Sequence, residues 1–256
     1  EKKFNIGNLE TLGDINRAEL IEFYNQHYSS NRMGLALLST HSLDQMEKWV
    51  KEYFSDIKNR NLARNRHDPV VLDEKETVRL INVEPIKDIR QMNIVFELPA
   101  TRDMYESKPE SQFGFIMGHE GKGSLLSYLK DTGWAITLSA GARAETKEYG
   151  FATVSIGLTE DGLKNYKEVL KSVVGYLDLM KSSGYQQHVF NELGSMASLN
   201  EIYSSKGEGM WRATQLANEA LMFPLDDAGR VNYIYRNNSP GPYNDLVSSL
   251  ETNKML

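Results

Sequence analysis

Histidine is the residue type in this chain best suited to bind a catalytic metal, and its spacing decides whether it does. The five histidines are His27, His41, His67, His119 and His188. None of them follows a glutamate, so the pattern H-x-x-E-H is absent; His119-Glu120 begins H-E-x-x-H, but Gly123 stands where the second histidine belongs. A zinc helix needs two imidazoles one turn apart on the same face. The sequence therefore predicts no metal ligands and no catalytic residues in this chain.

The glycine-rich segment Gly118–Ser124 (GHEGKGS) is the next candidate for chemistry, as a phosphate-binding loop. That loop requires Ser or Thr directly after Gly-Lys, and here Gly123 follows Lys122. The segment is better interpreted as a tight turn that leads into a helix. The chain has no cysteine, which excludes disulfides, thiolate zinc sites and cysteine nucleophiles.

The composition is that of a globular protein with an acidic balance. Lys and Arg number 29 and Asp and Glu 35, which gives a net charge of −6, and 40% of the residues are hydrophobic. The acidic balance argues against nucleic-acid binding, which usually needs a basic face. No apolar run approaches the ~20 residues that span a bilayer, so we expect no membrane span. Because the chain starts with Glu1 rather than Met, we expect a piece of a longer protein.

The first third of the chain is predicted to contain a helix, a strand and a second helix. Asp14 is expected to cap a helix over Ile15–Tyr28, in which apolar residues keep helical spacing. The apolar run Asn31–Ser39 has the length of a strand. Ser42 and Gln45 fit a capping box that opens a further helix.

The middle of the chain carries most of the strand signal. Alternating side chains predict strands, and a polar turn over residues 143–149 predicts a hairpin between the last two of them. The expected strands are Thr77–Val83, Gln91–Leu98, Trp134–Ala142 and Gly150–Leu158, with short helices over residues 110–118 and 125–129.

The last third is predicted to be helical. Thr159 is expected to cap one long helix that ends at Gly184, and four more helices are expected over residues 186–203, 209–221, 225–235 and 243–250. Helices and strands in mixed order, with strands joined by a hairpin, favour an α+β fold with an antiparallel sheet packed by helices.

Several separated strings carry a resemblance over essentially the whole chain. The strings are residues 27–33 (HYSSNRM), 84–90 (EPIKDIR), 118–129 (GHEGKGSLLSYL) and 157–163 (GLTEDGL), with Gly133-Trp134 and Phe190-Asn191-Glu192 in the same register. They resemble the insulysin branch of the insulysin/pitrilysin family of zinc metallopeptidases.

The resemblance implies an insulysin/pitrilysin-like α/β roll domain with a helical C-terminal part. In that family four related domains form two halves that close around a peptide, and zinc is bound in the first domain. Residues 1–28 resemble the lead-in from that catalytic domain, and residues 29–256 resemble the second, non-catalytic domain. The chain alone is then expected to be inactive and to hold no cofactor, with zinc in the parent enzyme.

The resemblance also implies a substrate-binding exosite that grips the amino-terminal end of a peptide. Glu120 would pair with the α-amino group, and a strand edge would add the peptide by backbone hydrogen bonds. Matched residue by residue, the implied substrate-binding set is Gly114, Phe115, Gly118, Glu120, Leu138, Ala140 and Ala142.

The sequence departs from that family branch at three positions. Ser111 and Phe115 stand where the branch has histidine, and Ala142 stands where it has glutamine. The expected partners are peptide substrates and the remaining domains of the same parent chain; a homo-oligomer and the compartment, periplasmic or cytoplasmic, are left open. The alternative function is a binding or assembly module of a parent that has lost the zinc motif.

Overall fold

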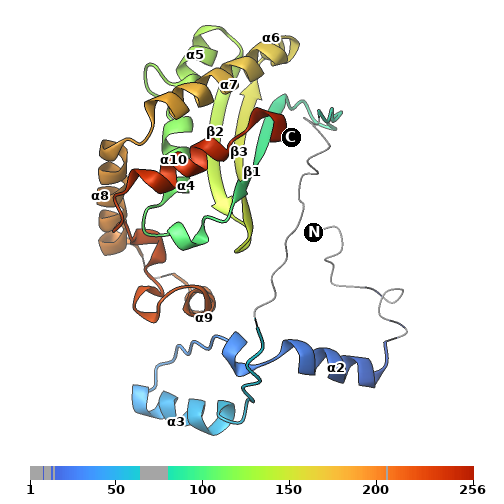
Figure 1. Cartoon of the computed structure of the whole chain (residues 1–256), viewed down its shortest axis with the longest axis vertical. Coiled ribbons are helices and arrows are strands. Elements are labelled where there is room, and N and C mark those ends of the chain that lie inside the picture. The colour runs from blue at the N-terminus through green and yellow to red at the C-terminus, as the bar shows by residue number, and fades with distance from the viewer. Residues whose placement is uncertain (1–7, 9–12, 14, 64–79, 206) are drawn as a thin grey trace. The chain divides into compact units, whose positions relative to one another are not determined.

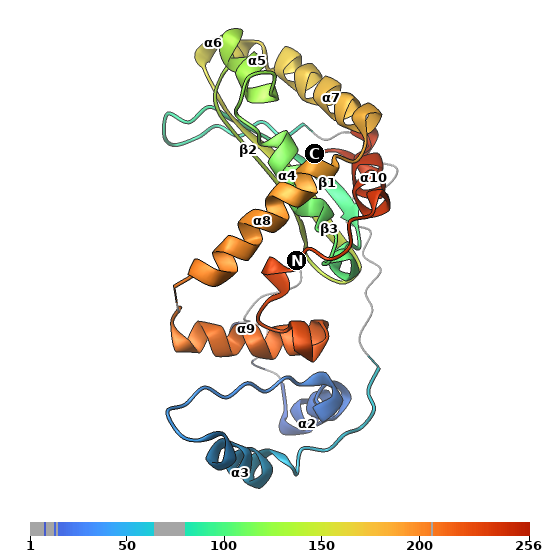
Figure 2. The same cartoon turned by 90° about the vertical axis from the view of Figure 1, so that its left-hand side faces the viewer.

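The computed structural model describes residues 8, 13, 15–63, 80–205 and 207–256. These residues belong to two compact units, one comprising Glu1–Asn65 with Lys206–Gly229 and the other Arg66–Ser205 with Arg230–Leu256. Figures 1 and 2 show the helices and strands of both units from two directions. Each unit is described by itself below.

The second unit is built on a three-stranded antiparallel sheet. Its strands are β1 (Gln91–Pro99), β2 (Ala135–Ala144) and β3 (Tyr149–Leu158), in the spatial order β1-β3-β2. Strand β3 alternates between buried and half-buried positions along its whole length. Since side chains of a strand alternate between the two faces, this pattern gives the sheet one covered face and one open face.

Helices cover one face of this sheet and form the core with it (Figure 1). Those that contribute core residues are α4 (Pro109–Met117), α5 (Leu125–Asp131), α7 (Tyr166–Ser183) and α10 (Pro240–Ser249). The short α6 (Glu160–Lys164) joins β3 to α7, and α8 (Gln187–Tyr203) packs against α4. Phe96 and Ile156 of the sheet, Phe113 of α4 and Leu177 of α7 are almost completely buried in this core. Burial of such side chains contributes roughly 1.5–3 kcal/mol each, which holds the helices on the sheet.

The two outer edges of the sheet differ. The edge of β1 is covered by the end of the chain, because the Val95 N–H donates to the Leu256 carbonyl at 2.7 Å and the Leu256 N–H donates to the Val95 carbonyl at 2.9 Å. A bridge between Phe96 and Met255 belongs to the same pairing. Strand β2 forms the opposite edge and, among the described strands, pairs with β3 alone.

The first unit contains α2 (Arg17–His27), α3 (Leu43–Phe54) and α9 (Gly209–Met222). Residues 33–39 run close to α9, since a β-carbon on Gly34 would lie 2.2 Å from the Ala217 carbonyl oxygen. Glycine is required there by close approach, not by a turn. The apolar side chains of this unit are largely exposed: α2 has no buried residue, and Leu38 is 62% exposed.

The predicted α+β class and antiparallel sheet are confirmed, as are the hairpin and the strand from Gln91. The helices expected near residues 110, 125, 187, 209 and 243 are also confirmed, although α10 begins at Pro240. Ser42 caps α3 as expected, accepting a hydrogen bond from the Gln45 N–H at 3.3 Å.

Five local predictions are wrong in the described residues. Asn16, not Asp14, caps α2, because its side chain accepts from the Ala18 and Glu19 N–H groups and Glu19 answers in a full capping box. Asp14 itself lies outside the described residues. Residues 33–39 and 80–83 are irregular rather than strands; an apolar run becomes a strand only where another strand pairs with it, and none of the described strands does. Residues 77–79 of the second run lie outside the described part.

The other two concern helices. Thr159 caps only the short α6, and α7 begins after a break at Asn165, whose side chain bonds the Asp161 carbonyl at 2.8 Å. Because of this break, the side chains of α6 and α7 do not continue one buried face: Val169 of α7 is buried, whereas Leu163 of α6 is 50% exposed. The predicted helix over 225–235 is two separate 3-10 turns, Leu225–Asp227 and Val231–Tyr233, with Gly229 at φ +83° between them.

Candidate functional site

The outer edge of β2 presents backbone groups that β3 does not use. In the hairpin, the Glu145 N–H donates to the Tyr149 carbonyl at 3.1 Å, so residues 145 and 149 form a hydrogen-bonded pair. Such pairs alternate along an antiparallel ladder. Residues 143, 141 and 139 therefore bond to β3, and the N–H and C=O groups of Ala142, Ala140 and Leu138 point outward. Within the described part of the chain, nothing hydrogen-bonds to the outward groups of these three residues.

Helix α4 passes directly against this edge at Ala140. A β-carbon on Gly114 would lie 3.3 Å from the Ala140 carbonyl oxygen, and one on Gly118 would lie 3.6 Å from the Ala140 nitrogen. The two glycines are four residues apart and share one face of the helix. The structure therefore brings Gly114, Gly118 and Ala140 together, with Leu138 and Ala142 on either side along the strand.

The turn that follows α4 places Glu120 two residues beyond Gly118. Gly118 caps the helix, its N–H donating to the Gly114 carbonyl at 2.9 Å. Ser124 closes the turn by accepting the Ser127 N–H at 3.1 Å as the cap of α5. Glu120 is exposed, and no ion pair joins its carboxylate to another described residue. The carboxylate is thus available to a cationic group from outside.

Phe115 lies on a different face of α4 from the two glycines. Its ring lines a cavity of about 450 Å³, called the second cavity below, together with His119, Tyr176 and Tyr243. The ring centroids of Phe115 and His119 are 6.1 Å apart. Burial raises the pKa of Tyr243 to about 12, with a contribution from Tyr176, so the phenol stays protonated at ordinary pH. The ring of Phe115 is therefore not among the groups that the structure brings to the β2 edge.

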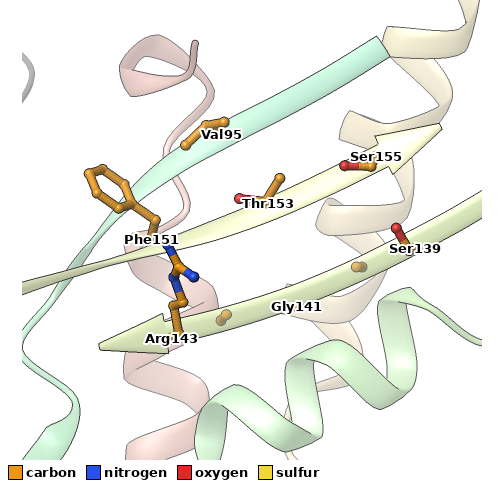
Figure 3. Close-up of a pocket in the computed structure, with 9 residues that line it drawn as sticks. Val95, Ser139, Gly141, Arg143, Phe151, Thr153 and Ser155 are labelled. Atoms are coloured by element: carbon orange, nitrogen blue, oxygen red, sulfur yellow. The ribbon is translucent and has the colours of Figure 1, made fainter. Parts of the chain in front are cut away.

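A shallow cavity of about 480 Å³ lies on the open face of the sheet beside the same edge (Figure 3). Residues that line it form three cross-strand rows: Ser155 with Ser139, Val95 with Thr153 and Gly141, and Phe151 with Arg143. In Figure 3 the Arg143 side chain reaches from β2 toward Phe151, and it forms an ion pair with Glu145. None of these residues was predicted from the sequence as part of a site, although the alternation along β3 assigns Phe151, Thr153 and Ser155 to one face.

The donor side chains present do not form a metal site among the described residues. Residues 15–63, 80–205 and 207–256 contain no cluster of three His, Cys, Asp or Glu side chains that could hold a metal ion. The described residues thus do not fit zinc, and no chemical step through zinc is derived for this chain. Among the same residues, no helix is both long and apolar enough to span a bilayer.

The fold and its free strand edge define an α+β domain with one open sheet face. A family model described as the peptidase M16 inactive domain matches residues 14–194. The chain therefore belongs to the M16 peptidase family, which confirms the resemblance to insulysin and pitrilysin.

Curated relatives and a solved structure agree with this assignment. The chain is 33% identical over 222 residues to the A-factor-processing enzyme of Saccharomyces cerevisiae, covering 84% of this chain and 22% of that protein. It is 30% identical over 239 residues to the insulin-degrading enzyme of Homo sapiens, covering 91% of this chain and 24% of that protein. The crystal structure of pitrilysin superimposes with a TM-score of 0.82 at 20% identity, covering 99% of this chain and 28% of that one, which shows the same fold. The chain spans about a quarter of the length of these relatives.

Proposed function

We propose that this chain is the peptide-binding, non-catalytic part of a longer zinc peptidase, and that it binds the amino-terminal segment of a peptide along the outer edge of β2. The observation that carries the proposal is the set of free outward N–H and C=O groups of Leu138, Ala140 and Ala142. An extended peptide forms hydrogen bonds with such an edge through its own backbone, largely regardless of sequence.

Glu120 supplies the amino-terminal preference. Its exposed carboxylate follows the Gly118 turn, and Gly118 lies against Ala140 in the middle of the edge. A peptide α-amino group would pair with it by a charge-assisted hydrogen bond. Gly114 and the backbone of Phe115 complete the helix wall beside the bound strand, so the proposed set remains Gly114, Phe115, Gly118, Glu120, Leu138, Ala140 and Ala142.

The parent's chemistry is proposed to lie in another domain. One relative, from Schizosaccharomyces pombe, carries the name putative zinc protease, while this chain spans only part of its relatives. The exposed apolar side chains of the first unit, such as Leu20 at 58% and Phe23 at 55%, fit a surface that other parts of the parent cover. A lead-in over residues 1–28 followed by the second domain from residue 29 stays a prediction. An upstream H-x-x-E-H motif in the parent gene would support the peptidase; its loss would favour the assembly module instead.

The test of strand addition uses the whole chain and a labelled peptide of about eight residues with a free amino terminus. Each peptide nitrogen is methylated in turn, and binding is followed by fluorescence anisotropy. We expect about tenfold weaker binding at every second residue and little change between them, because alternate N–H groups face the edge. Equal tolerance at all positions would contradict strand addition.

The amino-terminal contact is tested with Glu120→Gln and with acetylation of the peptide. Charge-assisted hydrogen bonds contribute roughly 1.5–3 kcal/mol, so each change alone should weaken binding about tenfold or more. The two changes together should cost little more than one of them, since they remove the same contact. Glu52→Gln on α3, also exposed, is the matched control and should leave affinity unchanged. Unchanged binding of the free-amine peptide to Glu120→Gln would remove Glu120 from the site.

A further inference from the structure

We propose that the open face of the sheet carries a side-chain subsite over Gly141, which selects peptides with a long apolar, preferably aromatic, residue opposite that glycine. This inference rests on the proposed strand addition at β2. It goes further by naming one peptide position and the class of side chain that this position prefers.

The first observation is the space over Gly141. A β-carbon built on Gly141 would meet no atom within 4 Å, so the glycine is not required by packing within the unit. Its row continues inward to Thr153 and Val95, which are half-buried and line the same cavity (Figure 3). The absent side chain leaves a gap in the row next to the free edge.

The second observation is the register that an added strand would take. Because Ala140 and Ala142 point their N–H and C=O groups outward, an antiparallel peptide residue opposite Gly141 would occupy a non-hydrogen-bonded position. Cα atoms at such positions are about 4.5 Å apart, and both side chains face the same side of the sheet. The peptide side chain at this position would therefore lie on the open face and above Gly141.

Strand spacing then sets the length of side chain that fits. Neighbouring strands lie about 4.8 Å apart, so β3 is roughly 9.6 Å from an added strand. Alanine or valine opposite Gly141 would end above the glycine. Phenylalanine, tyrosine or methionine would cross it and reach the methyl group of Thr153. Phe151, in the adjacent row, extends the apolar part of the surface.

The charges around the subsite favour an uncharged side chain. Arg143, the charged residue of β2 in this cavity, is already in an ion pair with Glu145. The neighbouring row is polar but uncharged, and its Ser155 hydroxyl donates to the Asn93 side chain at 2.8 Å. A peptide carboxylate or ammonium placed over Gly141 would find no unpaired opposite charge among these cavity residues.

The experiment compares peptides on three forms of the whole chain. A host peptide with a free amino terminus carries phenylalanine at each of residues 2 to 6 in turn, against the all-alanine host. For the native chain we expect one position where phenylalanine tightens binding about fivefold. The variant Gly141→Val places a branched side chain in the gap, where its β-carbon meets no atom within 4 Å, and should remove this advantage while the alanine host still binds. Thr137→Val, on the same strand but outside this cavity, should keep it.

The outcomes separate the subsite from the edge. Failure of every peptide to bind the native chain would refute strand addition itself. Binding without a phenylalanine preference, or a preference that survives Gly141→Val, would refute the subsite and leave strand addition standing. Equal weakening of both peptides by Gly141→Val would also refute it, because the glycine would then serve the edge and not the side chain.

Discussion

Replacing Gly114 by alanine tests the contact on which the site depends, the passage of α4 against the backbone of β2. In a helix interior this substitution normally stabilises a protein by about 0.5–1 kcal/mol, because glycine loses more backbone freedom on folding. At Gly114 the new β-carbon would lie 3.3 Å from the Ala140 carbonyl oxygen and 3.5 Å from the Gly141 Cα. Both neighbours are backbone atoms of a paired strand, so they have little room to move.

The balance of these two effects sets the expected result. Overpacking in a well-packed region costs about 1–3 kcal/mol and outweighs the gain, so Gly114→Ala should lower the free energy of unfolding by up to about 2.5 kcal/mol. Gly175 in the middle of α7 offers a matched control, since a β-carbon there would meet nothing within 4 Å. Gly175→Ala should therefore raise the free energy of unfolding by about 0.5–1 kcal/mol.

Urea unfolding followed by circular dichroism measures both variants, with the slope m compared to ensure that only stability has changed. We expect the urea midpoint to fall for Gly114→Ala and to rise for Gly175→Ala. If Gly114→Ala stabilises the chain as much as Gly175→Ala does, α4 does not approach the backbone of β2 closely at Ala140. The wall proposed for the peptide site would then be absent as well.

Two further predictions test other contacts of the same unit. Gly162→Ala should lower the free energy of unfolding by about 3 kcal/mol or more, because its β-carbon would lie 1.9 Å from the Trp134 carbonyl oxygen; a thermal midpoint close to that of the native chain would show that this approach is wrong. Glu110→Gln should stabilise the chain at pH 7 but not at pH 4. Burial raises the pKa of Glu110 above its ordinary value, so the folded protein loses stability as pH rises from about 4.3 through that raised pKa. Thermal midpoints from pH 4 to 7 measure this, and an equal gain at both ends would exclude ionisation as the cause.

Local patterns predicted most elements of the second unit but could not predict which strand edge stays open. Alternation marks the two faces of β1 and β3, and turn residues mark the hairpin. The order β1-β3-β2, and the pairing of Val95 with Leu256, join segments far apart in the chain. No local signal encodes that pairing, and it is what leaves β2 as the uncovered edge.

The resemblance predicted the candidate residues, and helix geometry explains why some of them face Ala140 of β2 while the Phe115 ring does not. Gly114 and Gly118 are four residues apart, so they share the face toward Ala140. Phe115 is rotated by about 100° from Gly114 around the helix axis, and its ring accordingly faces the second cavity with His119. The length of side chain that fits the subsite over Gly141 could not be predicted in this way, because it depends on which strands are neighbours in the sheet.

The asymmetry of the two sheet edges is itself an argument for a partner at β2. An exposed edge is a template for unwanted pairing, and proteins usually cover it, shorten it or place charge on it. This chain covers β1 with its own residues 255–256 and places the Arg143–Glu145 ion pair at one end of β2. The stretch between, residues 138–142, carries neither charge nor proline and consists of small or apolar side chains. An edge left unprotected over only these residues is long enough for a short extended peptide, and its protection is then expected to come from the peptide or from the parent.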